Sequence, residues 1–262
     1  MALTMLQKEV NGLDYNERTE FAIDCFLLAG RIMMESGAET YRVEDTMIRM
    51  AHSQGMMSAQ SYVTPTGIIF SLGRTQPTRI TSIPNRATNL HRISLVNTIS
   101  RKLTSSIITL EEAYDELKKI EKKNYMLPNF MQVLAAAVAS GCFLVMFAGV
   151  WQDFIPAMIA GGLGYWVLLL VTDVTKVKFF SEFIASVAVG VLAALAVKFG
   201  FGQQLDTIII GSVMPLVPGV IITIAIRDLM AGHFTSGLAR GIEALLTAFA
   251  IGSGIALALT VL

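Results

Sequence analysis

The chain has 262 residues, of which 53% are hydrophobic and 15% carry a charge. Soluble domains contain about 45–50% apolar and about 25% charged residues, so this composition favours a membrane protein and excludes a disordered, collagen-like or coiled-coil chain. Two cysteines are too few for a secreted scaffold held by disulfides. The charges are unevenly spread, because 29 of the 40 charged residues precede residue 129. The sequence therefore divides near Pro128 into a polar half and an apolar half.

The polar half begins with a charged segment, since the first twenty residues hold six charged side chains and no apolar stretch with a small-residue cleavage site. This pattern does not fit a secretory signal peptide, so we expect the polar half to stay in the cytoplasm. Cys25 and Cys142 lie in different halves. We therefore expect no disulfide between them, which suits a reducing compartment.

Apolar periodicity and turn residues predict four helices and three strands in the polar half. The helices are predicted at 16–36, 39–53, 88–103 and from Thr109 onward. The strands are predicted at 58–65, 66–73 and 77–84, bounded by proline and glycine as in a meander. Thr109 with Glu112 three residues later is the pattern of a capping box. The prediction for residues 1–124 is a cytoplasmic α+β domain.

The apolar half contains five segments with few or no charges and about 20 residues each, the length at which an α-helix crosses the hydrocarbon core. The predicted spans are 129–152, 154–172, 179–198, 207–226 and 240–262. Small residues are dense in AAAVASG at 135–141 and IGSG at 251–254, and small residues let helices approach closely in lipid. The predicted fold class is thus an α+β cytoplasmic domain followed by an all-α transmembrane bundle of five helices, residues 125–262.

The lysines and arginines near the span ends predict the orientation, because cytoplasmic connections are enriched in both residues. Four lysines between residues 118 and 123 precede the first span. The connections after the second and fourth spans carry Lys176, Lys178, Arg227 and Arg240, whereas the outer connections carry Lys198. We expect a cytoplasmic N-terminus and a periplasmic C-terminus.

Sequence motifs for metal or cofactor chemistry are missing: the histidines are scattered, and no zinc motif, phosphate-binding loop or nucleophile elbow occurs. We therefore expect no metal and no cofactor. The densest charged patch has two interpretations, a hydrolytic site or a solvated helix face with salt bridges. Its members are Glu35, Glu39, Arg42, Glu44 and Asp45.

The fourth predicted span contains MPLVPG at its centre, with Pro215, Pro218 and Gly219. Proline removes a backbone donor and clashes with the preceding turn, so the helix should break or kink near mid-membrane. In many transporters the ends of such half-helices bind the substrate, and a half-helix starting near Pro218 would offer N–H groups to a carboxylate. The alternative is a proline kink with a structural role alone.

The segment after this span carries charged residues close to the next span. Glu243 lies about one turn into the fifth span, three residues after Arg240, where a carboxylate is unfavourable unless it is paired or hydrated. Two interpretations stay open for Glu243. It either takes up and releases a proton in each transport cycle, or it forms a permanent pair with Arg240 that anchors the helix.

Three stretches of the sequence resemble the threonine/serine exporter family of bacterial inner-membrane proteins. They are ESGAETYRVEDTM at 35–47, VTPTGI at 63–68 and MPLVPGVIITIAIRDLMAGHFTSGLARGIEALL at 214–246. The resemblance implies a cytoplasmic N-terminal domain and membrane spans that export threonine, serine or dicarboxylates such as succinate. It also implies a substrate pathway that includes Pro215, Pro218, Gly219, Asp228, Gly232, Arg240 and Glu243.

Fused members of that family carry two unlike sets of spans in one chain, so five predicted spans resemble the larger component of the split form. The resemblance implies a second small membrane subunit as partner, a hetero-oligomer, and no nucleic acid. The expected function is a subunit of a secondary exporter driven by a proton or substrate gradient. Two alternatives stay open: a membrane-tethered hydrolase that uses Glu35, Glu39 or Asp45, and a regulatory subunit of a pore formed by the partner.

Overall fold

The computed structural model describes residues 2–73, 78–123 and 125–261. Residues 1, 74–77, 124 and 262, which fall in or at the ends of predicted ranges, lie outside this description. The chain forms two compact units. The first unit combines Met1–Met126 with Ile224–Ala239, and the second combines Leu127–Thr223 with Arg240–Leu262.

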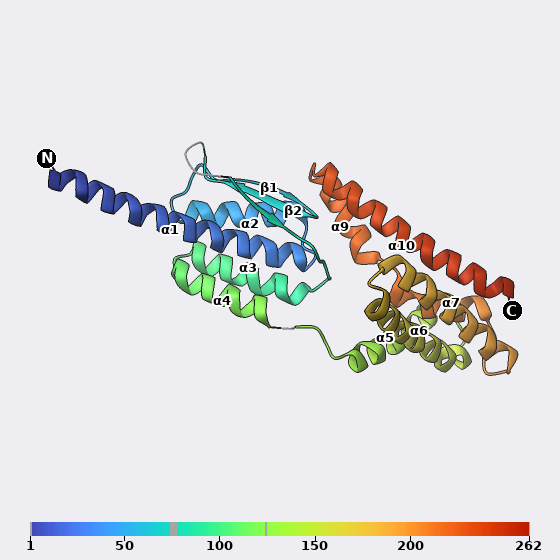
Figure 1. Cartoon of the computed structure of the whole chain (residues 1–262). Helices are drawn as coiled ribbons and strands as arrows, with labels where there is room; N and C mark the ends of the chain where they lie inside the picture. Colours follow the sequence, from blue (N-terminus) through green and yellow to red (C-terminus); the bar gives the residue numbers. More distant parts are fainter. Residues whose placement is uncertain (1, 74–77, 124, 262) are drawn as a thin grey trace. The chain divides into compact units, whose positions relative to one another are not determined.

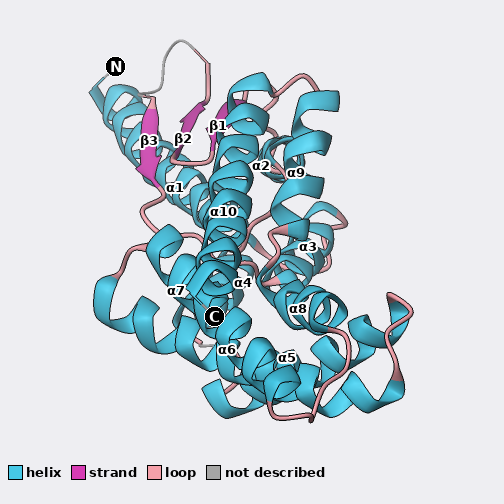
Figure 2. Cartoon of the chain, turned by 90° about the vertical axis from the view of Figure 1, so that its right-hand side faces the viewer, coloured by secondary structure: helices cyan, strands magenta, loops and turns pink. Residues whose placement is uncertain are grey.

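The first unit has three layers, with two helices between a small sheet and a second pair of helices (Figure 1). The helices are α1 (Ala2–Glu35), α2 (Thr40–Ser53), α3 (Leu90–Thr104) and α4 (Leu110–Lys122). The strands are β1 (Gln60–Thr64), β2 (Gly67–Ser71) and β3 (Arg79–Ser82). They pair antiparallel in the order β1-β2-β3, next to α1 in Figure 2. These elements confirm the predicted helices and meander, except that α1 begins well before residue 16.

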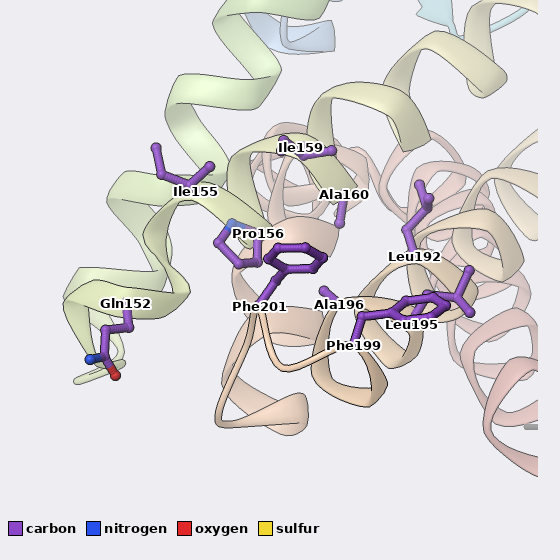
Figure 3. Close-up of a pocket in the computed structure, with 10 residues that line it drawn as sticks. All are labelled: Gln152, Ile155, Pro156, Ile159, Ala160, Leu192, Leu195, Ala196, Phe199 and Phe201. Carbon is purple, nitrogen blue, oxygen red and sulfur yellow. The ribbon is translucent and has the colours of Figure 1, made fainter.

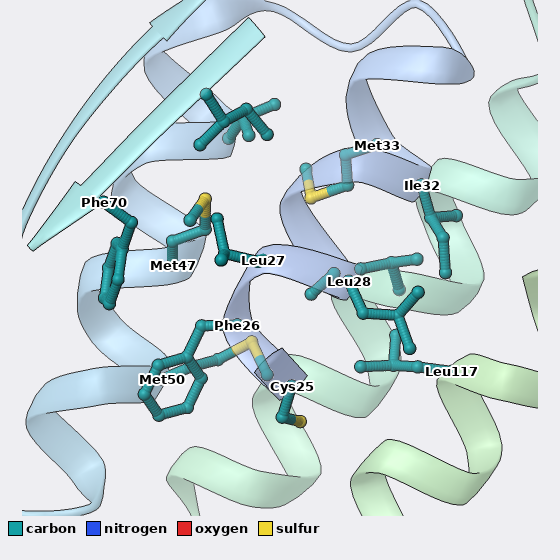
Figure 4. Close-up of a cluster of buried hydrophobic side chains, with 14 of the residues drawn as sticks. Cys25, Phe26, Leu27, Leu28, Ile32, Met33, Met47, Met50, Phe70 and Leu117 are labelled. Atoms are coloured by element: carbon teal, nitrogen blue, oxygen red, sulfur yellow. The ribbon is translucent and has the colours of Figure 1, made fainter. Parts of the chain in front are cut away.

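The core of the first unit is built around the apolar stripe of α1 (Figure 4). Phe26 and Met33 of α1 are fully buried, together with Met47 of α2, Phe70 of β2 and Leu117 of α4. The rings of Phe26 and Phe70 meet edge to face with centroids 6.0 Å apart. Full burial of each such side chain stabilises a fold by about 1.5–3 kcal/mol, so this cluster holds the three layers together.

The N-terminus of α4 is capped as the sequence predicts. The Thr109 hydroxyl accepts a hydrogen bond from the Glu112 N–H at 3.2 Å, and the Glu112 carboxylate accepts one from the Thr109 N–H at 2.8 Å. Both bonds satisfy N–H groups that a helix leaves unpaired at its start.

The second unit contains the apolar helices, of which α9 and α10 also contribute to the first unit. The long helices are α5 (Asn129–Met146), α6 (Phe154–Thr175), α7 (Lys178–Lys198) and α10 (Phe234–Val261). The shorter ones are the 3₁₀ turn η1 (Trp151–Asp153), α8 (Leu205–Val213), the 3₁₀ turn η2 (Met214–Leu216) and α9 (Gly219–Met230). α6 packs against α5, α7 and α8, α5 also packs against α8, and α10 meets α7 at small residues.

Glycine and serine make these close contacts possible. A Cβ on Gly161 of α6 would collide with the Ser140 side chain of α5, and a Cβ on Gly254 of α10 would collide with Ser186 of α7. Close approach of the backbones gives van der Waals contacts. These contacts stabilise helix packing in lipid, where the hydrophobic effect does not. The small residues predicted to mediate helix packing therefore do so at both places.

Four of the described helices are long and apolar enough to cross a membrane: α5, α6 with η1, α7 and α10. The pair formed by α8 with η2 and α9 passes the same test together, and it is bent by 59° at the break. Pro215 lies in η2, Pro218 lies in the break, and Gly219 begins α9. The predicted break of the fourth span is confirmed.

The predicted fold class, an α+β domain followed by an all-α bundle of five helices, is wrong. The part of the chain that the structure describes is 74% helical, and its strands form one small sheet between residues 60 and 82. Strands of four or five residues give too little surface to organise a domain, so the sheet covers one side of α1 and α2. The described apolar helices are four continuous ones and one broken pair, because Pro215 and Pro218 interrupt the helical hydrogen bonds.

Candidate functional site

A buried carboxylate on α9 binds the N-terminus of α2 within the first unit. Asp228 Oδ1 accepts a hydrogen bond from the Thr40 backbone N–H at 2.9 Å, and Oδ2 accepts one from the Thr40 hydroxyl at 3.0 Å. Both residues are fully buried. Glu39, the N-cap residue of α2, makes no capping hydrogen bond with its side chain. The Asp228 carboxylate therefore satisfies an otherwise unpaired N–H and lies at the positive end of the α2 dipole.

Glu39 lies beside this contact and binds two arginines. Its Oε1 accepts a hydrogen bond from Arg227 at 2.8 Å, and its Oε2 accepts one from Arg42 at 3.0 Å. Burial opposes the ionisation of Glu39, but its bonds with its own backbone N–H and with Arg227, together with Arg42, outweigh burial and hold its pKa below the ordinary value. Glu39 is thus a fixed negative charge between α2 and α9.

Glu44 forms a third polar contact between the same two segments. Its Oε1 accepts a hydrogen bond from the Val63 N–H at 2.9 Å, and its Oε2 lies 3.7 Å from His233 Nε2. Burial raises the pKa of the Glu44 carboxyl, the charge of Asp228 adds to the rise, and Val63 and His233 oppose it. We call the six polar side chains of these contacts the Asp228 cluster. Its members are Glu39, Thr40, Glu44, Arg227, Asp228 and His233.

A left-handed glycine after α9 lets the chain turn at the cluster. Gly232 has φ of 87°, a conformation that L residues with a side chain rarely adopt. The His233 N–H donates to the Asp228 carbonyl at 2.8 Å, which closes the turn. The turn therefore brings His233 back beside α9, where its ring approaches Glu44.

The broken span places three of the predicted pathway residues at the start of α9. The first helical hydrogen bond of α9 runs from the Ile222 N–H to the Pro218 carbonyl at 3.0 Å. A Cβ added to Gly219 would meet nothing within 4 Å among the described residues. The start of α9 at Gly219 thus lies in an open place, and carboxylate binding by this half-helix stays a prediction.

The two remaining predicted residues lie on α10 in the second unit. Glu243 accepts a hydrogen bond from the Lys178 ammonium of α7 at 2.7 Å. Arg240 is buried one turn earlier on α10. Glu182 of α7 and Thr247 of α10 lie one turn further along their helices, and both are buried. The structure therefore adds Lys178, Glu182 and Thr247 to the polar residues around Glu243.

A cavity of about 390 Å³ lies among α6, α7 and the loop after α7 (Figure 3). Its lining is apolar except for Gln152. The other lining residues are Ile155, Pro156, Ile159, Ala160, Leu192, Leu195, Ala196, Phe199 and Phe201. A polar metabolite with a carboxylate would lose its hydration there without gaining charged partners, so this cavity is a poor candidate for its binding site.

The contacts between α2 and α9 are the features of this candidate site that the sequence does not predict. Glu39 and Glu44 were predicted as members of a charged patch, but their partners Arg227 and His233 lie far along the chain. Helical spacing detects neighbours within one element only. The one signal in the sequence is that the stretches 35–47 and 214–246 contain side chains of opposite charge. Charge alone does not specify which residues are in contact.

Known proteins resemble this chain over almost its whole length. Residues 24–262 match a family model, ThrE, described as "Putative threonine/serine exporter". A "Probable succinate transporter subunit YjjP" of Klebsiella aerogenes is 24% identical over 248 residues, which cover 92% of this chain and 93% of that protein. The Escherichia coli protein of the same name is 23% identical over 249 residues, which cover 93% and 94%.

Another relative is longer than this chain. A "Probable threonine/serine exporter" of Mycobacterium tuberculosis is 21% identical over 245 residues, which cover 92% of this chain and 46% of that protein. No solved structure matches the chain. The family match and the apolar helices indicate a multi-pass membrane protein of a transporter family.

Proposed function

Because this chain belongs to the threonine/serine exporter family, we propose that it is the larger subunit of a secondary exporter for small metabolites that carry a carboxylate. The substrate is threonine and serine, or a dicarboxylate such as succinate, the two classes that the names of its relatives contain. Export is driven by a proton or substrate gradient. The substrate pathway includes Pro215, Pro218, Gly219, Asp228, Gly232, Arg240 and Glu243.

The observation that carries this proposal is the 59° break between α8 with η2 and α9. Irregular backbone at membrane depth is tolerated where it is buried in protein or lines a cavity, and half-helix N-termini bind carboxylates in other transporters. Gly219 keeps the start of α9 uncovered. The arrangement supports a carboxylate site at the N-terminal turn of α9.

Replacement of one proline tests this site. Pro218→Ala restores an N–H and permits a continuous helix, so we expect export of labelled threonine or succinate to fall about tenfold or more. Pro84→Ala is the control, since Pro84 is exposed in the first unit, outside the broken span. Export that is unchanged in a folded Pro218→Ala protein would contradict the proposal.

The hydrolase alternative is less well supported by the contacts of its candidate carboxylates. Glu35 lies 3.8 Å from Arg92, and Asp45 binds Arg49 at 2.8 Å on the exposed side of α2. Glu39 binds two arginines. Carboxylates held in ion pairs with arginine are poor general bases, because pairing favours their charged form. Hydrolysis by the purified full-length chain would favour the alternative.

We further propose residues 1–124 as a cytoplasmic domain and residues 125–262 as a transmembrane domain of the bacterial inner membrane. The N-terminus is cytoplasmic and the C-terminus periplasmic. The word "subunit" in the names of two relatives supports a second small membrane subunit and a hetero-oligomer. Protein purified from cells without such a partner should reconstitute into vesicles but export neither threonine nor succinate. Full export by this chain alone would contradict the two-subunit proposal.

A further inference from the structure

Two buried polar side chains of the second unit, one on α7 and one on α10, each hold an atom without a hydrogen-bond partner among the described residues. Glu182 of α7 is 7% exposed and Thr247 of α10 is 0% exposed. The Glu182 Oε2 and Thr247 Oγ1 atoms are both buried, and neither has a hydrogen-bond partner among the residues described. The Thr247 side chain lies close to the Glu182 carboxyl group. Buried polar atoms of this kind call for a ligand or a proton.

The charged neighbours of Glu182 come from its own helix and from α10. They are Lys178, four residues earlier on α7, and Glu243 on α10. The Lys178 ammonium binds Glu243 at 2.7 Å. From α6, the Thr175 hydroxyl lies 3.3 Å from that of Ser181, and neither group titrates. Lys178 is therefore a nearby cation, and in this structure it is bound to Glu243.

The depth of Glu182 makes its ionised form unfavourable here. It lies four residues inside the N-terminus of α7, which is about 6 Å along the helix axis. An ionised carboxylate at such depth needs a partner, and ionisable residues inside spans mark ion or proton pathways. No group of three or more His, Cys, Asp or Glu side chains among the described residues could hold a metal ion. The ligand that suits this site is a proton.

We propose that Glu182 is the proton-binding residue that couples export to the proton gradient. The inference rests on the proposed exporter function and names the coupling residue within it. It also moves the proton role from Glu243 to a carboxylate that is buried more deeply and forms no ion pair with any described residue.

Lys178 supplies the switch between two states of the site. In the state of this structure, Lys178 pairs with Glu243 and the Glu182 carboxyl holds one proton. In the other state, Glu182 has released that proton to the cytoplasm, and Lys178 turns to it, since residues four apart on a helix are neighbours. Each cycle takes one proton from the outer side and releases one inside, in exchange for substrate moving out. No bond is formed or broken other than the O–H bond of the carboxyl group.

Infrared spectroscopy tests the protonation of Glu182 without any transport assay. The purified full-length chain at neutral pH should show the carbonyl stretch of a protonated carboxyl group. Glu182→Gln should abolish this band, whereas Asp173→Asn, which removes an exposed carboxylate at the end of α6, should retain it. A band that is absent from the wild-type protein, or that survives in Glu182→Gln, would overturn the proposal.

Transport in inside-out membrane vesicles from the native host, which keep any partner subunit, tests the coupling. In Glu182→Gln, uptake of labelled threonine or succinate driven by a pH gradient should fall about tenfold or more, while exchange of labelled for unlabelled substrate stays within about twofold of wild type. Asp173→Asn should retain both activities. If Glu182→Gln retains gradient-driven transport, Glu182 does not couple. If wild-type vesicles exchange neither substrate, the proposed function fails, and the infrared result still decides the protonation of Glu182.

Discussion

Asp228 and Thr40 are 188 residues apart in sequence, yet the Asp228 carboxylate binds both the backbone N–H and the hydroxyl of Thr40. The contact joins the last turns of α9 to the first turn of α2 inside the first unit. A half-helix that begins at the break of an apolar span thus ends on a helix of the polar half. Any movement of α9 during transport would have to break this contact or carry α2 along with it.

Removal of the Asp228 carboxylate should destabilise the first unit. Asp228→Ala leaves the buried Thr40 N–H and hydroxyl without an acceptor, and hydrogen bonds to charged groups contribute about 1.5–3 kcal/mol each. We expect a clear fall in the apparent melting temperature in detergent. Asp45→Ala, which removes an exposed pair with Arg49, should change stability by less than about 0.5 kcal/mol. Equal effects of the two substitutions would argue against a structural role for the Asp228 contact.

The acid stability of the first unit should depend on Glu39. Its pKa lies below the ordinary value of 4.5, so it contributes stability that is present above pH 4.5 and is lost as the pH falls through its folded-state pKa. The stability contribution of Glu44 has the opposite pH dependence. Because its pKa is raised, the contribution is present below pH 4.5 and is lost as the pH rises through its folded-state pKa.

Melting temperatures measured from neutral to acidic pH check this assignment. Glu39→Gln should lower stability at neutral pH and flatten the loss below pH 4.5, because the titrating group is gone. Arg227→Gln, which removes one cationic partner of Glu39, should lower stability at neutral pH and make the loss below pH 4.5 smaller, because the pKa of Glu39 moves back toward its ordinary value. An unchanged pH profile in Glu39→Gln would show that Glu39 does not contribute to acid stability.

Features that depend on neighbouring residues could be predicted from the sequence, whereas contacts across the chain could not. The Thr109–Glu112 capping box and the break at Pro215 and Pro218 follow from local backbone chemistry, and both are present. The predicted fold class is wrong for a related reason. Strand patterns predict where short strands form, but they do not show how small a part of the domain the resulting sheet makes up. The Asp228–Thr40 contact requires α9 to meet α2, and no periodicity within either segment contains that information.

The partner of Glu243 illustrates the same limit. Arg240, three residues earlier on the same helix, was one predicted partner, since such spacing places two side chains together. The structure adds a bond to Lys178 on a different helix, and the Arg240–Glu243 pair stays a prediction. Sequence spacing identifies possible partners on the same helix. A partner that packing brings from another helix is found only in the structure.

The turn after α9 should depend on glycine at position 232. Gly232 has φ of 87°, and a Cβ there would meet nothing within 4 Å among the described residues, so only backbone strain opposes a side chain. Gly232→Ala should cost about 1–2 kcal/mol and lower the melting temperature. Gly241→Ala is the matched control, because its Cβ also meets nothing but its backbone is helical. We expect no loss of stability there, since alanine favours helix, and equal losses at both positions would contradict the strain argument.

The last prediction concerns the membrane topology, and two contacts of the second unit support it. Asp153, just before α6, accepts hydrogen bonds from the Gln203 and Gln204 N–H groups just before α8, at 2.7 and 3.0 Å. The starts of α6 and α8 therefore lie at one end of the unit. Lys178 at the start of α7 binds Glu243 in the first half of α10, so these segments lie at the other end, where α6 finishes.

These contacts favour a full crossing by the broken pair rather than a re-entrant loop. The chain enters α8 at the end of the unit where α6 begins. After α9 it continues into α10, which starts at Phe234 and whose first half lies at the opposite end. Four described helices could cross the membrane, or five spans if the broken pair counts as one. In the second case we expect the C-terminus on the opposite side of the membrane from the N-terminus. A reporter fused to the C-terminus should be active only in its periplasmic form, as should one placed after Lys198, while one placed after Thr175 should be active only in its cytoplasmic form. Cytoplasmic activity at the C-terminus, with both internal fusions as expected, would mean that α8 and α9 turn back within the membrane.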